Sequence, residues 1–322
     1  YLVPIAIAAV VLLVLVGTSY VQTIHAYPDG GGAYVVSREN ISPLASLVAG
    51  ASLLVDYTLT VAVSISSGVL AIGSAFDFND NSTLRVGLAL FFVAMMAVGN
   101  LRGLKESGKV FAVPTYFYVT MLMTFLAAGF YKMFTGDLHE INTSAQLAHH
   151  FEENHDLMAG ATLFVLLRAF SSGAVVLSGV EAISNGVPAF RKPESKNASQ
   201  TLAMMAAILG TGFLGISILA HHLKPVVDEG GETVLSQMAK SIFGGTNLLY
   251  YGLQFGTFAI LIMAANTAYA DFPRLSSLIA RDGYLPRQLG NRGDRLVFSN
   301  GVLVLSGMAG VLIVVFQAQV SA

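Results

Sequence analysis

The amino-acid sequence predicts an all-α integral membrane protein. Eight long apolar runs follow one another with almost no charge inside them, and each can cross the roughly 30 Å hydrocarbon layer of a bilayer as a helix. The chain of 322 residues is 54% hydrophobic and only 11% charged. An ordinary soluble globule is thereby excluded, because such proteins are about 25% charged. The runs are Tyr1–Ile24, Ser42–Phe76, Val86–Leu101, Val110–Tyr131, Met158–Phe190, Thr201–Ala220, Leu248–Ala270 and Leu296–Ala322.

Each run is expected to be helical, because lipid offers no partner for backbone N–H and C=O groups. The first run is too long for a secretory signal and lacks a basic flank. The second is longer than a bilayer needs, so we expect it to tilt. After the seventh run, apolar and basic residues in Phe272–Arg281 predict a short amphipathic helix on the inner surface.

The fifth run places serines and glycines in mid-membrane, which predicts a broken helix. Backbone groups freed at this depth are tolerated only where they face protein or a wet cavity, and half-helix ends aim partial charges at a solute. We therefore expect a substrate site with freed backbone at Gly173 and Gly179. The alternative is that both glycines allow close helix packing. Ser178 and Glu181 beside them favour the site.

A polar face on the second run predicts a cation site. The spacing of Tyr57, Thr60 and Ser64 places them on one stripe of a helix, with Asp56 one position round. Several neutral oxygens can replace the hydration shell of an alkali cation and still allow it to leave. The alternative is that Thr60 and Ser64 bond back to their own helix while Tyr57 packs.

Only three ionisable groups lie inside the runs: Asp56, Arg168 and Glu181. Such groups are costly in a membrane and mark functional sites. Asp56 and Glu181 are candidates for a proton-coupling step, since desolvation raises the proton affinity of a carboxylate. For Glu181, capping of the cytoplasmic half-helix is an equally supported alternative. Arg168 is expected to be a structural partner.

Basic residues gather in alternate loops. If the runs alternate in direction, the loops at 25–41, 102–109, 191–200 and 271–295 share one side and hold twelve of the 17 lysines and arginines. That side is predicted to be cytoplasmic, in a multi-pass protein of the plasma (inner) membrane. Because the chain starts and stops inside apolar runs, we expect a fragment of a longer protein.

Several classes of site are excluded or disfavoured. The sequence has no cysteine, and His149, His150 and His155 show no fixed ligand spacing, so no transition-metal site is expected. We find no nucleophile–base set for an enzyme within the membrane. No cofactor and no nucleic-acid partner are expected. The expected partners are the lipid bilayer and a small cation or amino acid, and a homodimer of the full-length protein is left open.

Five segments carry a resemblance to a known family: Tyr27–Tyr34, Gly99–Gly108, Ser178–Gly186, Ala265–Leu275 and Ala280–Arg287. They resemble the amino acid–polyamine–organocation superfamily and, within it, the KimA-type potassium–proton symporters. The likeness covers essentially the whole chain. It implies one transporter domain over residues 1–322 with a LeuT-like five-plus-five inverted repeat. Here that core would be truncated to about eight helices, helices two to nine, without the first helix and the C-terminal part.

The resemblance also implies which residues bind the ion. In the KimA-like branch, oxygens of helices three and six line the potassium site, and these positions fall on Tyr57, Thr60, Ser64 and Ser178 here. Ser178 stands where the relatives carry threonine, which keeps the oxygen. The predicted function is therefore proton-coupled potassium uptake by alternating access. The alternative is an amino acid permease of the same superfamily, which shares the scaffold.

Overall fold

Every element of the protein that can be described is a helix. The computed structural model describes residues 2–28, 32–103, 108–141, 180–226, 231–290 and 298–320, with Leu167 and Phe170, and none of these residues is in a strand. The elements are α1 (Leu2–Ala26), α2 (Ala33–Asn40), α3 (Pro43–Phe76), α4 (Ser82–Leu101), α5 (Gly108–Thr135), α8 (Val180–Asn185), η3 (Val187–Ala189), α9 (Glu194–Leu223), α10 (Val234–Phe243), α11 (Leu248–Arg281), η4 (Arg287–Gly290) and α12 (Ser299–Val315).

Six helices in the described part of the chain are long and apolar enough to cross a membrane. They lie in α1, α3, α4, α5, α9 and α11, and they confirm the prediction of an all-helical membrane protein. The eighth run forms α12, a shorter apolar helix of 17 residues. The broken helix predicted in the fifth run stays a prediction, because Arg168, Gly173, Ser178 and Gly179 lie outside the described residues.

Local chemistry sets the ends of α3 and α4. Ser42 caps the start of α3 by accepting a hydrogen bond from the Ala45 N–H at 3.1 Å, and proline follows at the first helical position. Asn81 caps α4 in the same way, through the Leu84 N–H at 3.0 Å. As a result, α4 begins four residues before the apolar run and includes Arg85, which is 2% exposed.

The segment Phe272–Arg281 is not a short helix of its own but the last part of α11. Pro273 lies inside this helix and removes one backbone hydrogen bond. The helix nevertheless continues, because its buried face continues: Phe272 and Ile279 are both buried. Gly301 of α12 packs directly against Pro273, where an added Cβ would lie 2.9 Å from the proline Cα.

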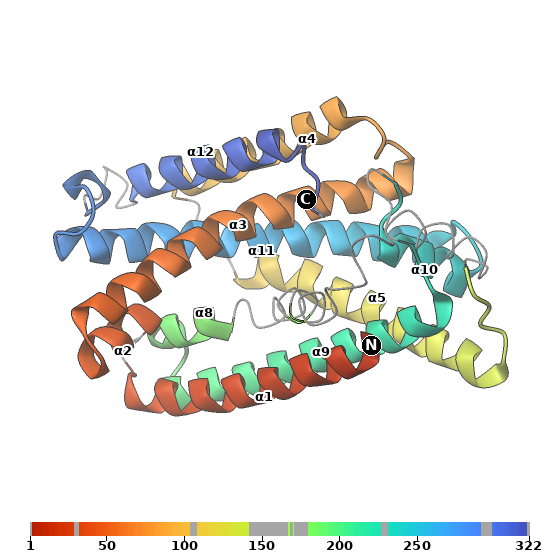
Figure 1. Cartoon of the computed structure of the whole chain (residues 1–322), viewed down its shortest axis with the longest axis horizontal. Coiled ribbons are helices and arrows are strands. Elements are labelled where there is room, and N and C mark those ends of the chain that lie inside the picture. The colour runs from red at the N-terminus through yellow and green to blue at the C-terminus, as the bar shows by residue number, and fades with distance from the viewer. Residues whose placement is uncertain are drawn as a thin grey trace. The chain divides into compact units, whose positions relative to one another are not determined.

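The described residues form two compact units. One comprises Tyr1–Val36 with Leu126–Val226, and the other comprises Ser37–Phe125 with Val227–Ala322. In the first unit α1 lies along α9 (Figure 1). Leu13, Ile24 and Leu202 are buried in its core. The single transporter domain expected over residues 1–322 stays a prediction.

The second unit is built on α3 and α11, two helices of 34 residues that lie side by side (Figure 1). Helices α4 and α12 pack against them and against each other. Val61, Ile65, Ala265 and Leu305 form the centre of this core and are fully buried. Small residues allow the close approach, since Gly68 of α3 lies against the Phe258 ring of α11.

Candidate functional site

The predicted cation-binding face lies on the middle of α3. This helix is continuous from Pro43 to Phe76, so Tyr57, Thr60 and Ser64 share one face as predicted. Tyr57 is half-buried and packs against the core of the second unit. Thr60 is half-buried, and Ser64 is buried with 9% of its surface exposed.

Among the described residues, the hydroxyls of Thr60 and Ser64 do not bond back to their own helix. Elsewhere on α3, Thr58 Oγ1 donates to the Leu54 carbonyl at 2.9 Å, and Ser74 Oγ donates to the Leu70 carbonyl at 2.9 Å. Among the described residues, Thr60 and Ser64 have no hydrogen-bond partner of this or any other kind. Their oxygens are therefore available for a ligand.

Asp56 lies on the exposed side of α3, beside Val55 and Leu59. Within the part of the chain that is described, its carboxylate makes no ion pair or hydrogen bond. A carboxylate without a structural partner on an apolar helix is the kind of group that serves a transport or proton pathway.

Glu181 has a structural contact. Its Oε1 accepts a hydrogen bond from the backbone N–H of Ala33 at 3.0 Å, within the first unit. Ala33 is the first residue of α2, so the carboxylate satisfies one of the N–H groups left free at a helix start and also lies at the positive end of its dipole. This contact favours a capping role for Glu181, although the cap is on α2 rather than on the predicted half-helix. Ser178, Gly173 and Gly179 lie outside the described residues, so their predicted roles stay predictions.

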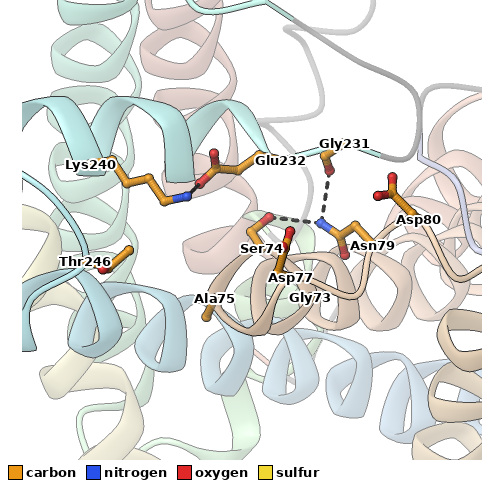
Figure 2. Close-up of a pocket in the computed structure, with 10 residues that line it drawn as sticks. All are labelled: Gly73, Ser74, Ala75, Asp77, Asn79, Asp80, Gly231, Glu232, Lys240 and Thr246. Atoms are coloured by element: carbon orange, nitrogen blue, oxygen red, sulfur yellow. Dashed lines mark hydrogen bonds and ion pairs between the residues drawn. The ribbon is translucent and has the colours of Figure 1, made fainter.

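A polar cavity of about 260 Å³ lies at the C-terminal end of α3, in the second unit. Figure 2 shows its lining: Gly73, Ser74, Ala75, Asp77, Asn79, Asp80, Gly231, Glu232, Lys240 and Thr246. Helix α3 ends here because Asp77 adopts a left-handed conformation, with φ of 57°, and its N–H bonds the Gly73 carbonyl. Three carboxylates give the cavity an acidic lining, which Lys240 partly offsets.

Asn79 holds the turn after α3 against the segment before α10. Its Nδ2 donates to Ser74 Oγ at 3.0 Å and to the Gly231 carbonyl at 3.0 Å. The other end of the amide packs on Gly73, because a Cβ added to that glycine would lie 1.8 Å from Asn79 Oδ1. Arg85 donates a hydrogen bond to the Asn79 carbonyl.

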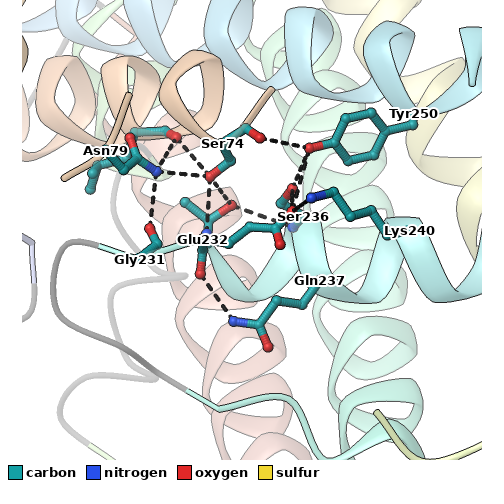
Figure 3. A network of polar contacts seen from close by, with 10 residues as sticks. Ser74, Asn79, Gly231, Glu232, Ser236, Gln237, Lys240 and Tyr250 are labelled. Atoms are coloured by element: carbon teal, nitrogen blue, oxygen red, sulfur yellow. Dashed lines mark hydrogen bonds and ion pairs between the residues drawn. The ribbon is translucent and has the colours of Figure 1, made fainter. Parts of the chain in front are cut away.

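Helix α10 is tied to α3 and α11 by six residues that we call the α10 cluster: Ser74, Glu232, Thr233, Ser236, Lys240 and Tyr250. Figure 3 labels all of them except Thr233. The Thr233 N–H donates to Ser74 Oγ at 3.0 Å. The Tyr250 hydroxyl lies 2.9 Å from the Ser74 carbonyl and 2.6 Å from Ser236 Oγ. Ser236 Oγ donates in turn to Glu232 Oε1 at 2.5 Å. Three separate parts of the chain are thereby fixed together.

Lys240 closes the cluster through an ion pair with Glu232, at 2.7 Å. Partial burial by itself lowers the pKa of Lys240. The hydrogen bond that Lys240 donates to Glu232 and the charges of Glu232, Tyr250 and Asp77 outweigh that effect, so the pKa of Lys240 lies above its ordinary value. The ammonium group therefore stays charged beside the carboxylates of the cavity.

The α10 cluster was not anticipated from the sequence. A local signal was present, because Thr233 is a good N-cap and Gly244 a good C-terminal residue for a helix over Val234–Phe243. No local signal connects Ser74 or Asn79 to this helix, since their partners lie more than 150 residues away along the chain.

These features define a helical membrane transporter, and comparison with known proteins agrees. The family model described as amino acid permease matches residues 1–322. The chain therefore belongs to the amino acid permease family of the amino acid–polyamine–organocation superfamily, which confirms the resemblance seen in the sequence.

Two relatives illustrate the range of this family. The chain is 47% identical over 319 residues to the potassium transporter KimA of Bacillus subtilis (strain 168), which covers 99% of this chain and 51% of the relative. It is 24% identical over 287 residues to the low-affinity putrescine importer PlaP of Escherichia coli (strain K12), which covers 87% of this chain and 59% of the relative. The chain thus spans between half and three fifths of the length of these relatives. The bacterial relatives and the apolar helices make it a multi-pass protein of the plasma membrane, as predicted.

Proposed function

We propose that the chain is the transmembrane part of a secondary transporter that takes up potassium together with protons by alternating access. The observation that carries this proposal is the 47% identity to a potassium transporter over 99% of the chain. The proposed architecture is a LeuT-like five-plus-five inverted repeat, of which about eight helices, two to nine, are present here. The six long apolar helices support that arrangement.

The proposed ion ligands are the oxygens of Tyr57, Thr60 and Ser64, together with Ser178. Support comes from the common helix face of the first three and from the unbonded hydroxyls of Thr60 and Ser64. Potassium loses most of its hydration shell on binding, so a set of neutral oxygens must replace the water. For the proton step we favour Asp56 over Glu181, because Glu181 already holds the start of α2.

Transport by the full-length protein in liposomes tests the substrate. Rubidium uptake driven by a pH gradient should be blocked by excess potassium and unaffected by amino acids or putrescine. The competing candidate, an amino acid or polyamine carrier, is favoured by the family description and by the similarity to a putrescine importer. Uptake of an organic solute with no competition from potassium would replace our proposal with that one.

Single hydroxyl deletions test the site. Removing one oxygen ligand in Ser64→Ala should weaken potassium binding by about tenfold, equivalent to about 1.4 kcal/mol. Ser66→Ala is the matched control, because Ser66 is also buried and unbonded among the described residues but lies on a different face of α3. Equal potassium affinities in the two variants would remove Ser64 from the site while leaving the substrate assignment intact.

A further inference from the structure

Gln254 carries a buried amide that has no hydrogen bonds within the described part of the chain. It lies on α11 one helical turn after Tyr250, and its side chain is 1% exposed. Neither its Nε2 nor its Oε1 has a hydrogen-bond partner among the residues that the structure describes. Among the described side chains with an orphaned buried atom, Gln254 is alone in having two such atoms.

Packing does not explain a glutamine at this position. Its neighbours along α11, Tyr250 and Leu253, are fully buried. Leucine or methionine would fill a similar volume without leaving a donor and an acceptor unpaired, which is costly in any protein interior and most of all in a membrane. A ligand that satisfies the amide accounts for its presence.

The chemistry of the amide selects the ligand. A cation could bind only Oε1 and would leave Nε2 unpaired, and an anion could bind only Nε2 and would leave Oε1 unpaired. A water molecule both donates and accepts, so it can serve both ends of the amide. We infer that Gln254 binds an internal water molecule that bridges it to the α10 cluster at Tyr250.

The neighbouring polar groups can complete the water's hydrogen bonds. Long side chains in a helix lean back over the preceding turn, which places the Gln254 amide toward Tyr250. The Tyr250 hydroxyl is already within 2.9 Å of the Ser74 carbonyl and 2.6 Å of Ser236 Oγ (Figure 3). These oxygens keep spare lone pairs, and buried waters typically make about three hydrogen bonds to such groups. Water also bridges polar groups that are too far apart for a direct bond.

This water extends the α10 cluster one helical turn along α11. Glu232, Ser236 and Tyr250 can each exchange a proton with a hydrogen-bonded neighbour, whereas an amide does not readily give one up. The series of hydrogen-bonded groups that can pass on a proton therefore ends at Gln254. The inference is independent of the transported substrate, because it concerns only α3, α10 and α11.

Hydroxyl-radical labelling by a short X-ray pulse detects such a water, because radicals formed from a bound water modify the side chains that touch it. In the full-length protein in lipid nanodiscs, Leu253 should be labelled although it is 0% exposed. Leu13 is equally buried, within an apolar core, and should stay unlabelled. Gln254→Leu should abolish the Leu253 label. Thr257→Val should leave it, since the Thr257 hydroxyl already bonds the Leu253 carbonyl at 2.8 Å.

Two results would overturn the inference. One is a Leu253 label in the unaltered protein no stronger than that of Leu13, a comparison that needs no variant and so does not depend on variant folding. The other is a Leu253 label that persists in both Gln254→Leu and Gln254→Met. Either result would mean that no water molecule is bound to the amide of Gln254.

Discussion

Asn100 of α4 donates a hydrogen bond from Nδ2 to Oδ1 of Asn266 on α11, at 2.9 Å. The two residues are 166 positions apart, and Asn266 is only 7% exposed. Each belongs to a different segment by which the sequence resembles its family, Gly99–Gly108 and Ala265–Leu275. The bond shows that the two segments lie next to each other and form a polar contact between the apolar helices α4 and α11.

Removing this contact should weaken the packing of α4 on α11. Polar bonds between membrane helices contribute about 0.6 kcal/mol on average and up to about 1.7 kcal/mol. We expect Asn100→Leu and Asn266→Leu each to lower the melting temperature of the purified protein. The double variant should lose less stability than the sum of the two, by about 0.6 kcal/mol of coupling. Strictly additive losses would show that the bond contributes nothing.

Gly73→Ala should disrupt the end of α3. The added Cβ would lie 1.8 Å from Oδ1 and 2.8 Å from Cγ of Asn79, so the amide must leave its place and give up its bonds to Ser74 and Gly231. We expect a loss of about 1–3 kcal/mol in the free energy of unfolding, as for other overpacked sites. Gly87→Ala is the control, because nothing lies within 4 Å of its added Cβ. If both variants unfold alike, the contact between Gly73 and Asn79 is not tight.

The helices were predictable because their signal is local. The length of an apolar run gives the length of the helix that it forms. For α3, Ser42 followed by Pro43 marks the start, so the predicted Ser42–Phe76 differs from the observed helix by one residue. The end of α11 was not predictable in this way. Basic residues near Phe272–Arg281 mimic an interfacial helix, whereas contact of Pro273 with Gly301 shows that the segment is buried in the second unit.

The candidate site was predictable only where it follows helical spacing. Tyr57, Thr60 and Ser64 share a face of α3 because the spacing alone fixes it. The α10 cluster depends instead on tertiary contacts, such as that of Ser74 with Thr233, which have no signature in one sequence. Glu181 shows the same limit, since its partner Ala33 lies 148 residues away.

The ion pair of Lys240 with Glu232 should give the protein a stability that depends on pH. The pKa of Lys240 is raised above its ordinary 10.5 in the folded protein, so the stabilisation is complete below 10.5 and disappears as the pH rises through the folded-state value. The Lys240 side chain is 37% exposed, so solvent screening limits the contribution to about 0–1 kcal/mol. Lys240→Met should therefore be less stable than the unaltered protein at about pH 8, and this difference in stability should shrink as the pH rises above 10.5.

Gln237→Met provides the control for that measurement. Gln237 is on the same helix and donates to the Glu232 carbonyl at 3.0 Å, but it has no titrating group. Its effect on denaturant unfolding should be the same across the alkaline range. A stability difference for Lys240→Met that stays constant up to the highest pH would exclude an electrostatic contribution.

Substitution of Asp56 and substitution of Glu181 should have different effects on proton-coupled uptake. Asp56 has no partner among the described residues, whereas Glu181 holds the Ala33 N–H at 3.0 Å. Asp56→Asn in the full-length protein should abolish uptake driven by a pH gradient while leaving the fold intact. Glu181→Gln keeps an acceptor oxygen for Ala33, so it should retain both the fold and the pH response. Glu181→Leu removes that acceptor and should cost about 1–2 kcal/mol of stability, as the loss of a helix cap does. If Glu181→Gln instead loses the pH response at full stability, the proton step belongs to Glu181 and the cap on α2 is secondary.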